Sequence, residues 1–98
     1  MGYVVIDNEI GKSYPITYMV LLSPQGKVQN IEIMAYREPH GSEVRFKSFL
    51  QQFFGKEASS DFQDINTISG ATLSVRSMTR AVRKTVAAFK VIYLEGEQ

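Results

Sequence analysis

The length, composition and charge of the chain limit what it can do. Its 98 residues amount to one domain, residues 1–98, which excludes an enzyme with separate substrate and cofactor domains. Cysteine is absent, which excludes disulfides, thiolate metal sites and thiol redox chemistry. The single histidine, His40, excludes a zinc site built on two imidazoles. The formal net charge of +1 is uninformative as a total, so charge must be examined locally.

The first third of the chain has the pattern of an antiparallel meander. Short β-branched and apolar runs are separated by turn residues at 7–9 and 11–13, and by a Pro-Gly hairpin turn at 23–26. The three predicted strands are Gly2–Ile6, Pro15–Leu22 and Lys27–Tyr36. Strict alternation in the third strand places Ile31 and Ile33 on the face toward the core and Val28 on the opposite face.

Two helices are predicted after the sheet. Ser42 is a good N-cap for a helix over Glu43–Phe54, with Gly55 as its C-terminal stop. The apolar stripe of this helix comprises Val44, Phe46, Phe49, Leu50 and Phe53. After an irregular segment, a second helix begins near Thr72 or Ser74 and continues to about Leu94. Its buried stripe comprises Val75, Met78, Val82, Val86 and Phe89. The predicted fold is α+β, with both helices on one face of a small antiparallel sheet.

The segment Ser69–Ser74 combines features that favour a phosphate. Gly70 permits a sharp turn and close approach of a ligand, and the free N–H groups and dipole of the second helix begin here. The helix carries several basic residues and no acidic residue before Glu95, and Thr72 places a hydroxyl at this electropositive end. The alternative, which general principles alone favour, is that the serine and threonine only cap the helix.

The same segment resembles the flavinylation motif of the FMN-binding domain family. This family includes the covalent-FMN subunits of sodium-pumping NADH:quinone reductases and of Rnf-type complexes. Ser69-Gly70-Ala71-Thr72 gives the order of the motif, and the stretches Lys12–Glu43 and Phe49–Lys56 continue the resemblance. It thus extends over most of the chain.

The resemblance implies a cofactor, a site and partners. It implies FMN bound through a phosphoester to Thr72, attached by a separate flavin transferase, and a loop around Glu38 and Gly41 beside the flavin ring. The implied cofactor-binding residues are Tyr36, Arg37, Glu38, Gly41, Ser69, Gly70, Ala71, Thr72 and Ser74. One position departs from the family pattern, because Asn66 stands where an aspartate is usual. If the transferase needs that carboxylate, non-covalent FMN binding is the alternative to attachment.

Several of these residues also have simpler interpretations. Arg37 and Glu38 would form a solvated ion pair of little energetic value, whereas beside a flavin Arg37 would stabilise its anionic reduced form. His40 is expected to be a surface loop residue, and Tyr36 is the tyrosine best placed to touch a ring. The basic side of the second helix, with Arg76, Arg80, Arg83 and Lys84, is expected to be a solvated face and not a nucleic-acid surface.

These observations lead to one functional prediction and two alternatives. The prediction is an electron-transfer flavoprotein domain that passes electrons to a redox partner protein, because the cofactor carries the chemistry and a single domain has no second cofactor motif. The alternatives are a flavin-dependent reductase and a cofactor-free interaction module that retains the fold. The resemblance favours an extracytoplasmic or membrane-associated location, with any membrane association provided by segments outside this chain.

Overall fold

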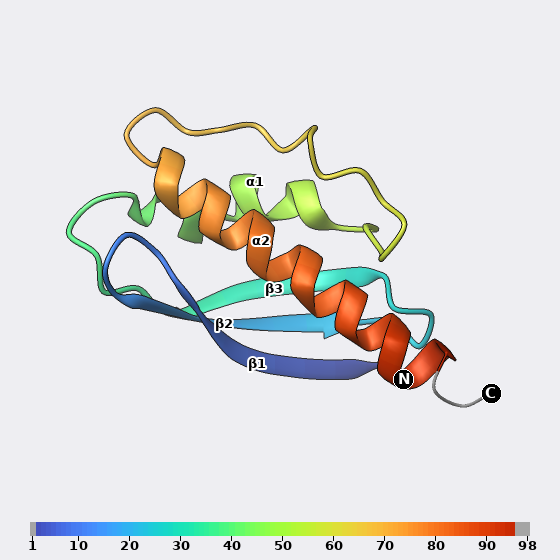
Figure 1. Ribbon diagram of the computed structural model, residues 1–98. Coiled ribbons are helices and arrows are strands. Elements are labelled where there is room, and N and C mark those ends of the chain that lie inside the picture. The colour runs from blue at the N-terminus through green and yellow to red at the C-terminus, as the bar shows by residue number, and fades with distance from the viewer. Residues whose placement is uncertain (1, 96–98) are drawn as a thin grey trace.

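The computed structural model, which describes residues 2–95, has a three-stranded antiparallel sheet with helices on one face (Figure 1). The strands are β1 (Tyr3–Ile10), β2 (Pro15–Leu22) and β3 (Val28–Ala35), in the order β1-β2-β3. The long helix α2 (Thr72–Phe89) runs diagonally across the sheet, and the short helix α1 (Lys47–Leu50) packs against β3. The predicted α+β class is therefore confirmed.

The central strand β2 forms the floor of the core. Its alternate residues Ile16, Tyr18, Val20 and Leu22 are fully buried, whereas the residues between them are only partly buried. One face of the strand therefore packs against the helices and the other remains open. Each aliphatic side chain fully buried in this way contributes about 1.5–3 kcal/mol relative to an exposed one, which fixes the register of the meander.

Strand β1 is longer than predicted. The turn expected at residues 7–9 is wrong, because the strand continues to Ile10 and pairs with β2 throughout. The polar residues are satisfied inside the sheet: Asn8 accepts a hydrogen bond of 2.6 Å from the Thr17 hydroxyl. Glu9 accepts from Arg80 at 2.7 Å and from Lys84 at 3.0 Å, which ties β1 to α2. These tertiary partners override the turn preference of the residues themselves.

The predicted facing of β3 is wrong at its first residue. Val28 is buried together with Ile31, and Ile33 is only partly buried. The cause is a register shift: Leu22 pairs with Val28, but the preceding residue Leu21 pairs with Asn30. The extra residue is a β-bulge, which reverses the alternation and turns Val28 toward the core.

The predicted first helix is wrong as a continuous element. It is divided into a 3₁₀ turn η1 (Ser42–Arg45), α1, and a 3₁₀ turn η2 (Gln51–Phe53). Phe46 between η1 and α1 is extended, at φ −67° and ψ 137°, and is 60% exposed. Val44 and Phe49 are five residues apart and would face different directions on one helix. The break at Phe46 lets both side chains reach the core. Ser42 does not act as the N-cap, since Gly41 occupies that position.

The second helix agrees with its prediction. All five residues of the expected stripe are buried, and the helix begins at Thr72. After Phe89 the chain continues as π-helical turns, η3 (Lys90–Glu95), so the helical segment extends to the predicted end. Phe89 packs against Tyr3 and Tyr93, with ring centroids 5.0 Å and 4.9 Å away. Within residues 2–95, no helix combines the length and apolar character needed to cross a membrane.

Candidate functional site

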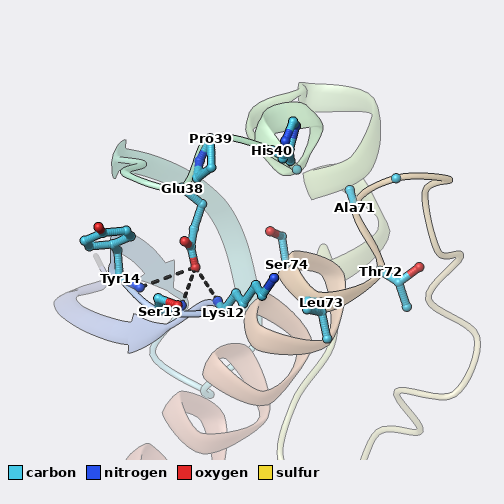
Figure 2. Close-up of a pocket in the computed structure, with 12 residues that line it drawn as sticks. Lys12, Ser13, Tyr14, Glu38, Pro39, His40, Ala71, Thr72, Leu73 and Ser74 are labelled. Carbon is cyan, nitrogen blue, oxygen red and sulfur yellow. Dashed lines mark hydrogen bonds between the residues drawn. The ribbon is translucent and has the colours of Figure 1, made fainter.

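Two loops that are far apart in the sequence form a cleft of about 510 Å³ at the N-terminal end of α2 (Figure 2). One loop, Glu38–Gly41, follows β3, and the other segment, Gly70–Ser74, leads into α2. The resemblance implies that both segments border one flavin, and the structure brings them together in one cleft. A third wall, which was not predicted, consists of Lys12–Tyr14 in the turn between β1 and β2.

A tight contact joins the two loops. The Tyr36 hydroxyl donates to the carbonyl of His40 and lies 2.5 Å from Oγ of Ser74, which is buried. Gly41 sits against both side chains at φ +89°, a conformation that other residues rarely adopt. A methyl group on Gly41 would lie 2.5 Å from the Ser74 Oγ and 2.6 Å from the Tyr36 hydroxyl oxygen. The contact between Tyr36 and Ser74 therefore fixes the positions of the two loops relative to each other.

Glu38 holds the third wall in place. Its Oε2 accepts hydrogen bonds from the backbone N–H groups of Lys12, Ser13 (2.6 Å) and Tyr14 (3.3 Å), drawn as dashed lines in Figure 2. These hydrogen bonds lower the pKa of Glu38 below its ordinary value of 4.5, and the bond from the Ser13 N–H has the largest effect. The carboxylate therefore stays ionised, and the three backbone donors stabilise its negative charge at the edge of the cleft.

Arg37 does not join the cleft. Its Nη1 donates to the carbonyl of Pro15 at 2.7 Å and to the Thr17 hydroxyl at 3.1 Å, so the guanidinium lies along β2. The alternative of an Arg37–Glu38 ion pair is therefore wrong. Because Arg37 is engaged with the sheet, the structure does not bring it to the other predicted site residues.

Replacing Glu38 with Gln tests the anchoring of the Lys12–Tyr14 wall. A neutral amide accepts weaker hydrogen bonds than a carboxylate, so we expect faster exchange of the Ser13 and Tyr14 amide protons and weaker FMN binding. In the wild type these amide signals are expected to titrate in NMR spectra with a midpoint below pH 4.5. The sign follows from the lowered pKa: the bonds stabilise the fold above the unfolded-state pKa of Glu38 and are lost as pH falls through its folded value.

Glu32→Gln is the control, because Glu32 is an exposed carboxylate on β3 that does not line the cleft. Equal amide exchange and equal FMN affinity in both variants would contradict the anchoring role of Glu38.

The start of α2 presents free backbone donors to the cleft. The Ala71 N–H donates to Ile68 at 2.9 Å, and the first helical bond runs from Val75 N–H to the Ala71 carbonyl at 2.9 Å. The N–H groups of Thr72, Leu73 and Ser74 consequently have no partner among the described residues. No side chain caps the helix, so the capping interpretation of Ser69 and Thr72 is wrong. The dipole of an 18-residue helix makes this end electropositive.

The hydroxyl that could form a phosphoester is at the rim of the cleft. Thr72 is exposed, and in Figure 2 its hydroxyl points away from the Glu38 side of the cleft. Gly70, at φ +84°, makes the turn that precedes it. Ala71 is buried under the turn and also lines the cleft, whereas Ser69 is exposed outside the lining.

Several lining residues were not predicted. Tyr14 and Leu73, about half exposed, supply apolar surface, and Lys12 and Ser13 complete the third wall. The position of Lys12–Tyr14 beside the site could have been predicted from the strand topology. In an antiparallel meander the turn after the first strand and the end of the third strand lie at the same end of the sheet, which places Lys12–Tyr14 beside Glu38.

The sequence profile of the FMN-binding domain matches residues 11–87, and this chain belongs to that family. Its cofactor is FMN. Among curated proteins, no sequence matches the chain. The matched region contains all three walls of the cleft, from Lys12 to Ser74.

The chemistry of the cleft fits FMN. Its volume of about 510 Å³ lies in the range of small-molecule sites, roughly 300–1,000 Å³. The free N–H groups at the start of α2, together with Lys12, suit the phosphate. The exposed apolar surfaces of Tyr14 and Leu73 suit a flat aromatic ring system. Both halves of the cofactor therefore find matching groups within one cleft.

Proposed function

We propose that this domain is an electron carrier in which FMN is joined to Oγ1 of Thr72 through a phosphoester bond. The position of Thr72 carries the proposal: a free, exposed hydroxyl at the electropositive end of α2, on the rim of a cleft that fits FMN. The Thr72 oxygen attacks the flavin phosphate of an activated donor, a flavin dinucleotide: the Oγ1–H bond is replaced by an O–P bond, the phosphoanhydride P–O bond breaks, and the second nucleotide leaves as its monophosphate. A flavin transferase catalyses this attachment.

The residues of the cleft have distinct roles in this proposal. The N–H groups of Leu73 and Ser74 and the turn at Gly70 receive the phosphate. Tyr36 and Ser74 act indirectly, because their contact fixes the two loops relative to each other. The loop at Glu38 and Gly41 borders the ring. FMN, when bound, supplies the reversible uptake and release of electrons, and the protein binds and orients it and tunes its electrostatic surroundings.

A redox assay separates the electron carrier from a flavin-dependent reductase. The flavin-loaded protein is reduced chemically, and its reoxidation by a one-electron acceptor is followed at the flavin absorbance. The carrier is expected to pass its electrons once, without sustained turnover of NADH or NADPH. Continuous oxidation of either nucleotide by the domain alone would support the reductase and contradict the carrier.

The cofactor-free interaction module makes a different prediction. A protein that remains colourless after co-production with a flavin transferase and magnesium, and that takes up no added FMN, would favour that alternative. We expect a yellow protein, because the free donors and apolar surfaces of the cleft are matched to the cofactor.

The Asn66→Asp variant tests the departure from the family pattern. Asn66 is exposed, and its backbone N–H donates to Oε1 of Gln52 at 2.7 Å, so this hydrogen bond does not depend on the Asn66 side chain. If the transferase reads a carboxylate here, the fraction of protein carrying covalent FMN rises in Asn66→Asp. The fraction is measured by intact mass after co-production, with Asn30→Asp on β3 as the control. An unchanged fraction would show that Asn66 does not limit attachment.

A further inference from the structure

A second concave surface runs along the exposed side of α2. It is an open groove of about 660 Å³ between the helix and the loop that precedes it. Four basic residues of α2 line it, and none of its lining residues is acidic. Apolar atoms form its floor, contributed by Phe62, Ile65, Val75 and Ala87. The basic residues are Arg76, Arg80, Arg83 and Lys84, so this side of the helix is more than the uniformly solvated face expected from sequence.

The charge of the groove is only partly balanced. Glu9 of β1 pairs with Arg80 at 2.7 Å and with Lys84 at 3.0 Å. Burial of Glu9 opposes ionisation, but the hydrogen bonds and charges of these two cations together lower its pKa, so it remains ionised. Arg76 and Arg83 have no carboxylate partner within the part of the chain that the structure describes. The groove therefore presents four cations against one carboxylate.

The loop residues that line the groove, Phe62, Ile65 and Thr67, are uncharged. Asp64, in that loop, is held by Lys56 at 2.8 Å. The same lysine and Arg83 lie over the Phe62 ring, at 5.3 Å and 6.0 Å from its centroid. The Arg83 guanidinium therefore makes a cation–π contact with Phe62, and no ion pair with an acidic side chain is found for it among the described residues.

The groove begins beside the proposed flavin attachment. Arg76 follows Thr72 by four residues, one turn of α2, so the two side chains share a side of the helix. From Arg76 to Lys84 the cations extend over about 12 Å, at 1.5 Å of rise per residue. That length exceeds what a single small anion needs, and the open apolar floor resembles a contact surface rather than an enclosed ligand site.

We infer that this groove docks the acidic surface of the redox protein that exchanges electrons with the flavin. The inference rests on the proposed function. Encounters between redox proteins use small interfaces and are steered by complementary charge. A carboxylate-bearing protein seated from Arg76 to Lys84 would border the start of α2, where Thr72 carries the cofactor. Each electron that leaves the reduced flavin then reduces one acceptor centre in that protein.

One haem protein in two charge forms tests the inference. The oxidants are native cytochrome c, which is basic, and the same protein with its lysines succinylated, which is acidic. The FMN-loaded domain is reduced and mixed with each ferric form in a stopped-flow instrument over a series of salt concentrations. We expect the acidic form to react faster at low salt, and its rate constant to fall about tenfold or more as salt screens the attraction.

Charge reversal identifies the surface responsible. Arg76→Glu combined with Arg83→Glu is expected to lower the low-salt rate constant for the acidic oxidant about tenfold or more. The matched control is Arg45→Glu combined with Lys47→Glu, which changes net charge equally on exposed residues outside the groove. Flavin content is measured first in every sample. Equal rate loss in the two double variants would overturn the inference, because only net charge would then matter.

The other outcomes separate the two proposals. A wild-type protein that takes up no flavin overturns the proposed function. A flavin-loaded protein that reacts equally with both forms of cytochrome c overturns the docking inference alone. If the groove variant keeps its rates but no longer binds a single-stranded oligonucleotide that the wild type binds, the groove is a nucleic-acid site and the inference is wrong.

Discussion

Thr72→Val is expected to lose all flavin that survives denaturation when it is produced together with a flavin transferase. Valine keeps the β-branched shape of threonine but lacks the oxygen that would form the phosphoester. The fold should change little, because the Thr72 side chain makes no capping hydrogen bond and its removal costs less than the ~1 kcal/mol of a typical cap. Covalent flavin is measured by absorbance of the denatured, desalted protein, and folding by circular dichroism.

Two further variants make this result specific to one hydroxyl. Thr72→Ser retains an oxygen at the same place and is expected to retain covalent flavin. Thr67→Val removes an exposed hydroxyl from the loop just before the motif and should label as the wild type does. Covalent flavin in Thr72→Val equal to that of the wild type would assign attachment to another residue.

Gly41→Ala is expected to damage both stability and FMN binding. The residue is left-handed, at φ +89°, so a side chain costs about 1–2 kcal/mol in backbone strain alone. The added methyl would also collide with Ser74 and Tyr36, and the loss of their hydrogen bond adds about 0.5–1.5 kcal/mol. We expect destabilisation of about 2–3 kcal/mol in denaturant unfolding, with a marked loss of FMN affinity.

Gly55→Ala provides the matched control. Gly55 has nearly the same backbone conformation, φ +85°, but a methyl there would meet no atom within 4 Å, and the residue lies outside the cleft. Gly55→Ala is expected to be destabilised by the same backbone strain but to cause no steric collision, and it should bind FMN as the wild type does. If both variants lost the same stability and kept the same FMN affinity, the contact between the two loops would not support the site.

The regular parts of the fold could be predicted because their patterns are local. The stripe from Val75 to Phe89 has helical spacing over many turns, and the almost continuous apolar run at residues 16–22 indicates the central strand β2. The departures depend on partners distant in the sequence. Glu9 remains in a strand because its carboxylate forms ion pairs with Arg80 and Lys84 of α2. Val28 turns toward the core because β3 contains a β-bulge. No pattern within those segments indicates such partners.

The candidate site could be predicted where a motif marked it. Gly70 and Thr72 were identified from their place before a helix, and Gly41 from the loop after β3. The wall at Lys12–Tyr14 was missed because its role depends on Glu38, whose carboxylate folds back onto the backbone. Arg37 was assigned to the site from the resemblance, with its charge as the reason for a role beside the flavin, but the Pro15 carbonyl and the Thr17 hydroxyl hold it on the sheet.

Peptide mass mapping of the protein co-produced with a flavin transferase tests the central claim most directly. The digest is separated, flavin-absorbing peptides are collected, and fragmentation locates the modified residue. The account predicts one flavin peptide that carries FMN less one water, with the modification on Thr72. A flavin peptide modified at a different residue, or a fully folded protein with no covalent flavin, would contradict it.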